Sequence, residues 1–126
     1  MSDSTPYKQE RGNIVGNQTI SEKVELWGKI QGDVRVVEGG KLYHRGAIYG
    51  DLIVDRGGRV HTYGPVTGDL FVFKGAKVIV SGIVSGNATN DGGRLYVDRD
   101  GQVSGKIKTL RGETEVEAKD VFDEEG

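Results

Sequence analysis

The sequence predicts an all-β protein, a single-domain parallel β-helix (β-solenoid) with three sides, 18 residues per coil and about five to six coils. Three observations lead to this fold class. An 18-residue pattern recurs along the chain, aliphatic residues recur every six positions within it, and glycine is abundant (21 of 126 residues) while proline is rare (two residues). This much glycine suits a fold with many tight turns, because glycine reaches positive φ angles without steric cost.

The repeat is most regular in the middle of the chain. Three segments align without a gap: GKIQGDVRVVEGGKLYHR from Gly28, GAIYGDLIVDRGGRVHTY from Gly46 and GPVTGDLFVFKGAKVIVS from Gly64. A degraded fourth copy with one extra residue begins at Gly82, and a fifth begins at Gly101. Repeats of this kind indicate that each coil contacts only its neighbours in the stack.

Within each repeat, the six-residue period assigns one buried anchor to each side of the coil. The anchors are all aliphatic: Val24, Ile30, Val36, Leu42, Ile48, Val54, Val60, Val66, Val72, Val78 and Val84. An α-helix is excluded because six-residue steps would carry the anchors round its axis, and a glycine in every turn would cost roughly 1 kcal/mol. In extended strands, Leu52 and Val54 point inward while Ile53 and Phe71 point outward.

Glycines indicate the corners of each coil, and the extent of the repeat indicates where the solenoid begins and ends. Gly39–Gly40 and Gly57–Gly58 indicate one corner of the coil. We expect residues 12–118 to form the solenoid, between a disordered N-terminal tail over residues 1–11 and an acidic C-terminal tail over residues 119–126. The first eleven residues lack the apolar core of a signal peptide and no stretch approaches the length of a membrane span, so we expect a cytoplasmic protein.

The tandem G-x-V-x-G-D-L-x-V units resemble the bactofilin family, the polymer-forming cytoskeletal proteins of bacteria. The resemblance covers roughly residues 28–112 and rests on the repeat and the overall size. It implies a right-handed triangular β-helix that assembles end to end into non-polar filaments without nucleotide, as a scaffold for cell shape, polarity or surface structures. The regular Gly-Asp turns and the acidic C-terminal tail depart from the family's pattern, and they bear on polymerisation more than on the fold.

We identify no catalytic, cofactor-binding or metal-binding residues, and we expect that the protein is not an enzyme. No nucleophile elbow, P-loop or paired-carboxylate motif occurs, and there is no cysteine. Zinc enzymes built on left-handed 18-residue coils use three histidine ligands, whereas this chain has only His44, on the inward phase, and His61, on the outward phase.

Two charged columns are expected on the outside of the stack. Asp33, Asp51 and Asp69 follow the corner glycines, where we expect them to satisfy backbone groups of their turns; a calcium site is the alternative. Lys41, Arg59 and Lys77 form a basic ladder that we interpret as a solvated edge. The net charge of −2 gives no general attraction for nucleic acid, which we do not expect as a partner.

Outward apolar residues are the candidate protein-interaction sites, because a solvated strand is expected to be polar there. The candidates are Ile53, Phe71, Phe73, Val37, Trp27 and Phe122. The sequence leaves two alternatives for these residues: they contact a partner, or a tail folds back over them.

Two hypotheses about function follow. The first is a non-enzymatic structural scaffold that self-assembles through its terminal coils into a homo-oligomer or filament, because end coils present unpaired backbone groups. The alternative is a monomeric or dimeric protein-binding module, such as a neutralising or tethering partner, that uses the Phe71 and Phe73 face.

Overall fold

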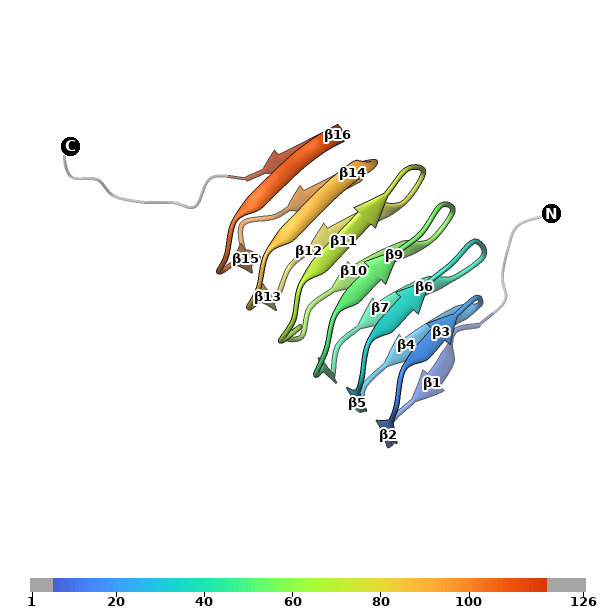
Figure 1. Cartoon of the computed structure of the whole chain (residues 1–126). Coiled ribbons are helices and arrows are strands. Elements are labelled where there is room, and N and C mark those ends of the chain that lie inside the picture. The colour runs from blue at the N-terminus through green and yellow to red at the C-terminus, as the bar shows by residue number, and fades with distance from the viewer. Residues whose placement is uncertain (1–5, 118–126) are drawn as a thin grey trace.

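The computed structural model of the protein describes residues 6–117, and all regular elements in this range are strands. They form a parallel β-solenoid of about six coils with a repeat of about 18 residues, which confirms the predicted fold class (Figure 1). The strands are β1 (Lys8–Glu10), β2 (Asn13–Val15), β3 (Gln18–Ile20), β4 (Lys23–Leu26), β5 (Lys29–Gln31), β6 (Val34–Val36), β7 (Lys41–His44), β8 (Ala47–Ile48), β9 (Leu52–Val54), β10 (Arg59–Thr62), β11 (Leu70–Phe73), β12 (Lys77–Val80), β13 (Ile83–Val84), β14 (Ala88–Val97), β15 (Gln102–Val103) and β16 (Ile107–Val116).

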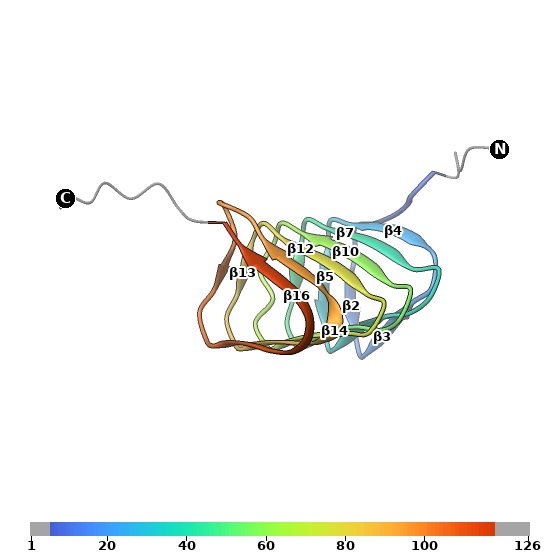
Figure 2. The same ribbon diagram turned by 90° about the horizontal axis from the view of Figure 1, so that it is seen from above.

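Each coil visits three faces in turn, and Figure 2 shows the successive coils stacked one behind another from the N-terminal to the C-terminal side. The first face stacks β1, β4, β7, β10 and β12, followed by the second halves of β14 and β16. The second face stacks β2, β5 and β8, then isolated bridges through Val66, then β13 and β15. The third face stacks β3, β6, β9 and β11, followed by the first halves of β14 and β16.

The interior is a column of mainly aliphatic side chains. All eleven predicted anchors are buried. The alternation along strands is also as predicted, since Leu52 and Val54 are buried and Ile53, between them, is partly exposed. Because parallel coils stack at about 4.8 Å, each anchor packs on its equivalent in the next coil.

Glycine is required at the corners for two different physical reasons. A Cβ atom added to Gly46 would lie 1.8 Å from the carbonyl oxygen of Gly28, so the close approach of neighbouring coils excludes any side chain there. Gly57 has a φ of 80°, in the left-handed region that non-glycine residues rarely adopt.

The coil boundaries differ from the expected ones at the N-terminus. Strand β1 lies inside the segment expected to be a disordered tail, and it pairs with β4 from Lys8 to Glu10. The solenoid therefore begins before residue 12. Beyond a bulge where Phe73 faces both Asp91 and Gly92, the fourth copy is shorter by one residue, since Lys77 then pairs with Arg94. The extra residues lie in the turn between Val97 and Gln102, which pair with Val80 and Ile83. Residues 6–117 contain no helix that is long and apolar enough to cross a membrane.

Candidate functional site

The predicted apolar face exists, but it is narrower than expected. Ile53 and Phe71 are paired neighbours on the third face and both are half-buried. Phe73 is the more exposed of the two phenylalanines, with 37% of its surface accessible, and Val37 is half-buried. Four of the six candidate residues therefore lie on or beside one face.

Ion pairs border this apolar strip along the stack. Arg35 contacts both carboxylate oxygens of Asp55 at 2.9 and 2.7 Å, and Arg111 pairs with Asp91 at 2.9 Å. The other two candidates do not join the strip: Trp27 lies at a different corner of the coil, and Phe122 is outside the described residues.

Trp27 belongs to a column of alternating cations and aromatic rings, whose members Trp27, Arg45 and Tyr63 each come directly before a corner glycine in the sequence. Its ring lies between the guanidinium groups of Arg11 and Arg45, at 5.1 and 5.2 Å, and Arg45 also lies 4.6 Å from the ring of Tyr63. Trp27 is 42% exposed, so it neither closes the core nor covers an end. Trp27, Arg45 and Tyr63 share one repeat position, so the repeat alignment could have revealed this column, but the sequence analysis did not predict it.

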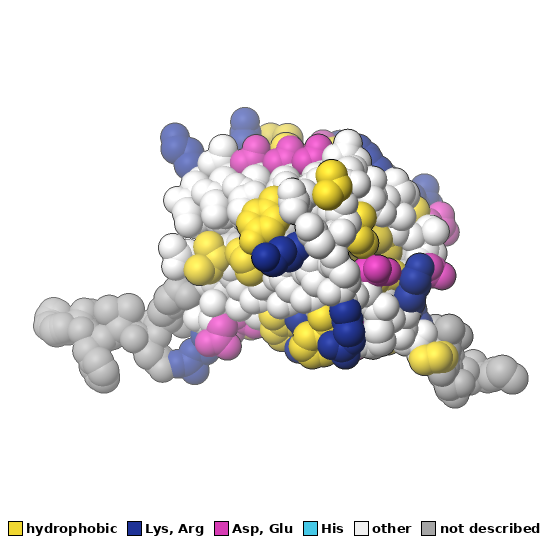
Figure 3. Space-filling view, turned by 90° about the horizontal axis from the view of Figure 1, so that it is seen from below, with side chains coloured by type: hydrophobic (Ala, Val, Ile, Leu, Met, Phe, Trp, Pro, Cys, Tyr) yellow, Lys and Arg dark blue, Asp and Glu magenta, His cyan; other side chains and the backbone are white. Residues whose placement is uncertain are grey.

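The same column holds a fixed salt bridge. Arg45 donates to Glu25 at 2.8 Å, and the side chain of Gln9 donates to the other oxygen of Glu25 at 2.7 Å. The hydrogen bond from Gln9, followed by that from Arg45, lowers the pKa of Glu25. Figure 3, viewed from the side of the second face, shows hydrophobic and basic side chains interleaved along one edge, opposite a row of acidic side chains.

The acidic column is a hydrogen-bond ladder between coils. The Oδ1 atom of Asp33 accepts the backbone N–H of Asp51, and the Oδ1 atom of Asp51 accepts that of Asp69, each at 2.8 Å. The aspartates therefore satisfy backbone groups, as expected, but those of the next coil rather than of their own turns. Within residues 6–117, no group of three or more His, Cys, Asp or Glu side chains is placed to hold a metal ion.

His44 lies in the core, on the inward phase as expected. It is fully buried, and its Nδ1 atom contacts Thr62 Oγ1 at 2.6 Å while its Nε2 atom has no hydrogen-bond partner. Burial lowers the pKa of His44 to about 4. The imidazole is therefore neutral at physiological pH and serves as a core side chain.

His61 lies on the outward side of the first face within a hydrogen-bonded chain that sequence reasoning missed. Ser81 Oγ donates to Asp98, which leaves His61 Nε2 as the donor to Ser81 at 2.8 Å and Nδ1 as the acceptor from Tyr63 at 3.2 Å. Burial is the main cause of a lowered pKa for His61. A nucleophilic serine needs its proton accepted by the histidine, and here the order of donors is the reverse.

The C-terminal end carries a second unpredicted network. Asn90 occupies an inward position that is aliphatic in the preceding coils and is fully buried. Its Nδ2 atom contacts the carbonyls of Gly93 and Glu113 and the hydroxyl of Thr114, and its Oδ1 atom accepts the N–H of Gly93. The broken fourth copy thus fastens β14 to β16.

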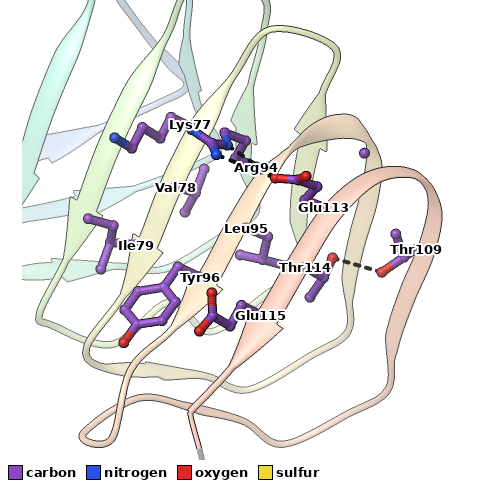
Figure 4. A pocket seen from close by; sticks show the side chains of 11 residues that line it. Lys77, Val78, Ile79, Arg94, Leu95, Tyr96, Thr109, Glu113, Thr114 and Glu115 are labelled. Carbon is purple, nitrogen blue, oxygen red and sulfur yellow. Dashed lines mark hydrogen bonds and ion pairs between the residues drawn. The ribbon is translucent and has the colours of Figure 1, made fainter.

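A recess of about 780 Å³ lies beside this network and is shown in Figure 4. Arg94 and Glu113 face each other across its corner, while Thr109 and Thr114 are joined by a hydrogen bond of 2.7 Å. On the outward side, Tyr96 donates to Glu117 at 2.7 Å, and this hydrogen bond raises the pKa of Tyr96 to about 12. The Arg94–Glu113 pair and the Thr109–Thr114 hydrogen bond engage four of the side chains that line this recess, whereas Lys77 on its wall forms no ion pair within residues 6–117.

The two terminal coils differ in what their inward positions carry. At the N-terminal end these positions include Lys8 and Glu10, paired in register with the buried Val24 and Leu26. At the C-terminal end they include Ile107 and Val116, which are 37% and 54% exposed. The N-terminal end thus carries charged inward residues on β1, although Ile14 and Ile20 of the same coil pack on the core.

No protein family, curated protein or solved structure matches this chain. The resemblance to the bactofilins therefore rests on the repeat pattern and the overall size, and the structure shows a β-solenoid of about six coils. Function has to be argued from the faces and ends of this solenoid.

Proposed function

We propose that the protein is a non-enzymatic structural scaffold, of the bactofilin type, that self-assembles through its terminal coils. The observation that carries this proposal is the state of the last coil. Among the described residues, β16 has a paired neighbour on one side only, and its inward-phase residues Ile107 and Val116 are 37% and 54% exposed. An open strand edge with apolar inward positions favours pairing with another chain.

The difference between the ends predicts which contact forms first. Lys8 and Glu10 place charges on the inward phase at the N-terminal end, a device by which natural sheets discourage edge pairing. The C-terminal coil has uncharged inward residues, including Thr109 and Thr114. We therefore expect the C-terminal coils of two copies to meet first, related by a two-fold axis, with the N-terminal contact weaker.

The chemistry of the described residues supports a non-catalytic role. Polar groups that could act in catalysis are engaged in structural hydrogen bonds: the aspartate column accepts backbone N–H groups, and the hydroxyl of Ser81 donates to Asp98. Burial keeps His44 neutral and inaccessible. A scaffold of this kind requires neither metal nor cofactor.

Assembly can be tested by sedimentation equilibrium, light scattering and negative-stain electron microscopy over a wide protein concentration range. The buffer would contain EDTA and no nucleotide. We expect a mass that rises from monomer to dimer and then to elongated particles whose width matches a single solenoid. A strict monomer at high protein concentration and physiological salt would contradict the proposal.

The exposed Phe73 supports a second candidate, a module that binds another protein through the third face. Phe73 and its neighbours Ile53 and Phe71 form an apolar strip between ion pairs. The double substitution Phe71→Asp and Phe73→Asp should then abolish capture of a partner while the melting temperature stays within a few degrees. Unchanged capture would end this alternative.

A further inference from the structure

One corner of the stack collects cations that have no carboxylate partners. The basic corner, between the third and first faces, comprises Arg56, Arg59, Lys74 and Lys77. All four are exposed, and none forms an ion pair with any residue in the range 6–117. Arg59 and Lys77 are paired neighbours in register, so about 4.8 Å separates their strands. Like charges this close repel, so the corner favours an anionic partner.

A groove runs beside the basic corner on the first face. It has a volume of about 170 Å³, with Arg59, Lys77 and Lys41 on one side and Tyr43, His61 and Ile79 on the other. The groove thus combines an apolar, aromatic wall with a cationic wall. Its aromatic rings contact one another: Tyr43 and His61 lie 6.0 Å apart, and His61 stacks on Tyr63 at 4.1 Å. Rings engaged in this way offer edges rather than free faces, so the groove is poorly suited to stacked nucleic-acid bases.

The chain that follows Glu117 has the complementary chemistry. Residues 118–126, which lie outside the described range, read AKDVFDEEG and contain Asp120, Asp123, Glu124 and Glu125 around the apolar pair Val121–Phe122. We name residues 118–126 the acidic segment. The acidic segment has four carboxylates and one lysine, whereas the basic corner has four cations without ion pairs to the described residues.

Glu117, the residue that precedes the acidic segment, is held on the first face, where the groove lies. The backbone N–H of Glu117 donates to Val97 at 2.8 Å, and the Glu117 side chain accepts from Tyr96. Tyr96 stands in register beside Ile79 on the outward side of the first face. Phe122 is five residues beyond Glu117, a reach of up to roughly 17 Å. Two strand spacings and two residues along β12 place Ile79 only roughly 12 Å away.

We propose that the acidic segment of the same chain binds in this groove, with the apolar pair against Ile79 and Tyr43 and the carboxylates on the basic corner. Binding there neutralises the basic corner and leaves the exposed last coil free. The inference does not depend on self-assembly, because both partners belong to one molecule.

The absence of cysteine in the chain makes a matched cross-linking test possible. Val121→Cys is combined either with Ile79→Cys, in the groove, or with Ile83→Cys, on the second face. Ile79 and Ile83 are the same residue type in the same coil, each two positions from Ser81, on opposite sides of the corner. Oxidation at low micromolar protein is followed by mass spectrometry, and each rate is divided by the reactivity of the single cysteine toward a small disulfide reagent.

We expect the Ile79 pair to form an intramolecular disulfide about tenfold faster than the Ile83 pair at low salt, because a bound segment raises the effective concentration of the thiol. In 1 M salt, where the Debye length is about 3 Å, the ratio should fall to within about twofold of unity. Glutamine at all four positions of the basic corner should have the same effect at low salt. Glutamine at Lys29, Lys106 and Lys108 should leave the ratio unchanged.

Equal rates at low salt would overturn the proposal, as would disulfide-linked dimers as the main product, since these would place the segment on a second copy. Circular dichroism melting of each variant separates these outcomes from a failure to fold.

Discussion

The middle coils and the C-terminal coils of this solenoid follow different rules. From Gly46 to Val80 the repeat is strict, and every predicted anchor is an aliphatic side chain covered on both sides by its equivalents. From Ala88 onward the register slips by one residue at Arg94 and again along β16, a buried asparagine replaces an anchor, and the last strand is almost entirely exposed.

This difference indicates that the middle coils contribute most of the buried packing, whereas the last coil carries the exposed edge on which the proposed assembly depends. A middle coil has neighbours above and below, so apolar side chains there gain burial on both sides. A terminal coil has one neighbour, so its apolar inward residues gain burial on one side only. Polar inward residues such as Asn90 and Thr114 then fasten the last strand without requiring a partner.

The largest contrast is expected from a charge at an inward position. Val54→Asp places a carboxylate in a fully buried site, and we expect a loss of about 4 kcal/mol in the free energy of unfolding. Val116→Asp, at a site that is 54% exposed, should cost less than about 1 kcal/mol. Urea denaturation at low protein concentration measures both. Comparable losses at the two sites would remove the distinction between middle and end.

His44 is a polar exception within the middle coils, and it predicts a pH dependence. Burial lowers the pKa of His44 from 6.5 to about 4 in the folded state. Between these values the unfolded chain binds a proton that the folded protein does not, so stability is complete above pH 6.5 and falls by about 3 kcal/mol as the pH approaches 4. His44→Leu should flatten this part of the curve. Urea titrations at several pH values give the answer, and an identical decline in the variant would refute the assignment.

Substitution of equivalent corner glycines in a middle coil and in the first coil should have different effects on stability. Gly46→Ala would place a methyl group 1.8 Å from the Gly28 carbonyl oxygen, and we expect the forced separation of coils to cost about 2 kcal/mol. Gly12→Ala occupies the same column in the first coil, where no atom lies within 4 Å of the added carbon, so its melting temperature should match that of the wild type. If both variants melt alike, close approach is not the reason for glycine at this corner.

The smallest effect is expected in the aspartate ladder. Asp51→Ala deprives the backbone N–H of Asp69 of its acceptor and should cost about 1 kcal/mol, whereas Asp51→Asn keeps an oxygen in place and should cost less. Thermal unfolding followed by circular dichroism can resolve the two. A larger loss for the asparagine variant would mean that the charge, and not the hydrogen bond, matters at this position.

Sequence reasoning reached the fold because the signal was periodic. Eleven anchors at six-residue spacing fix the faces and the phase of residues such as Leu52 and Ile53, and the structure confirms them. It did not reach the N-terminal boundary, because Lys8 and Glu10 are charged residues on an inward phase and carry no hydrophobic signal.

The candidate sites were harder to predict because they depend on side-chain contacts between coils. The position of Phe71 and Phe73 followed from alternation, but their partial burial did not. The Trp27–Arg45–Tyr63 column joins unlike residues one coil apart, and Asn90 contacts Gly93 in its own coil as well as Glu113 and Thr114 in the next. No single-residue pattern reveals such pairs. Whether the candidate residues bind a partner remains a prediction.

The central claim is that the middle coils hold the fold while the last coil joins molecules. Sedimentation velocity of the wild type and of the double variant Ile107→Asp and Val116→Asp, over the same concentration series, tests it most directly. The account predicts that the wild type associates with rising concentration, whereas the variant stays monomeric with an unfolding free energy within about 1 kcal/mol of the wild type. Association that is unchanged in the variant would contradict it.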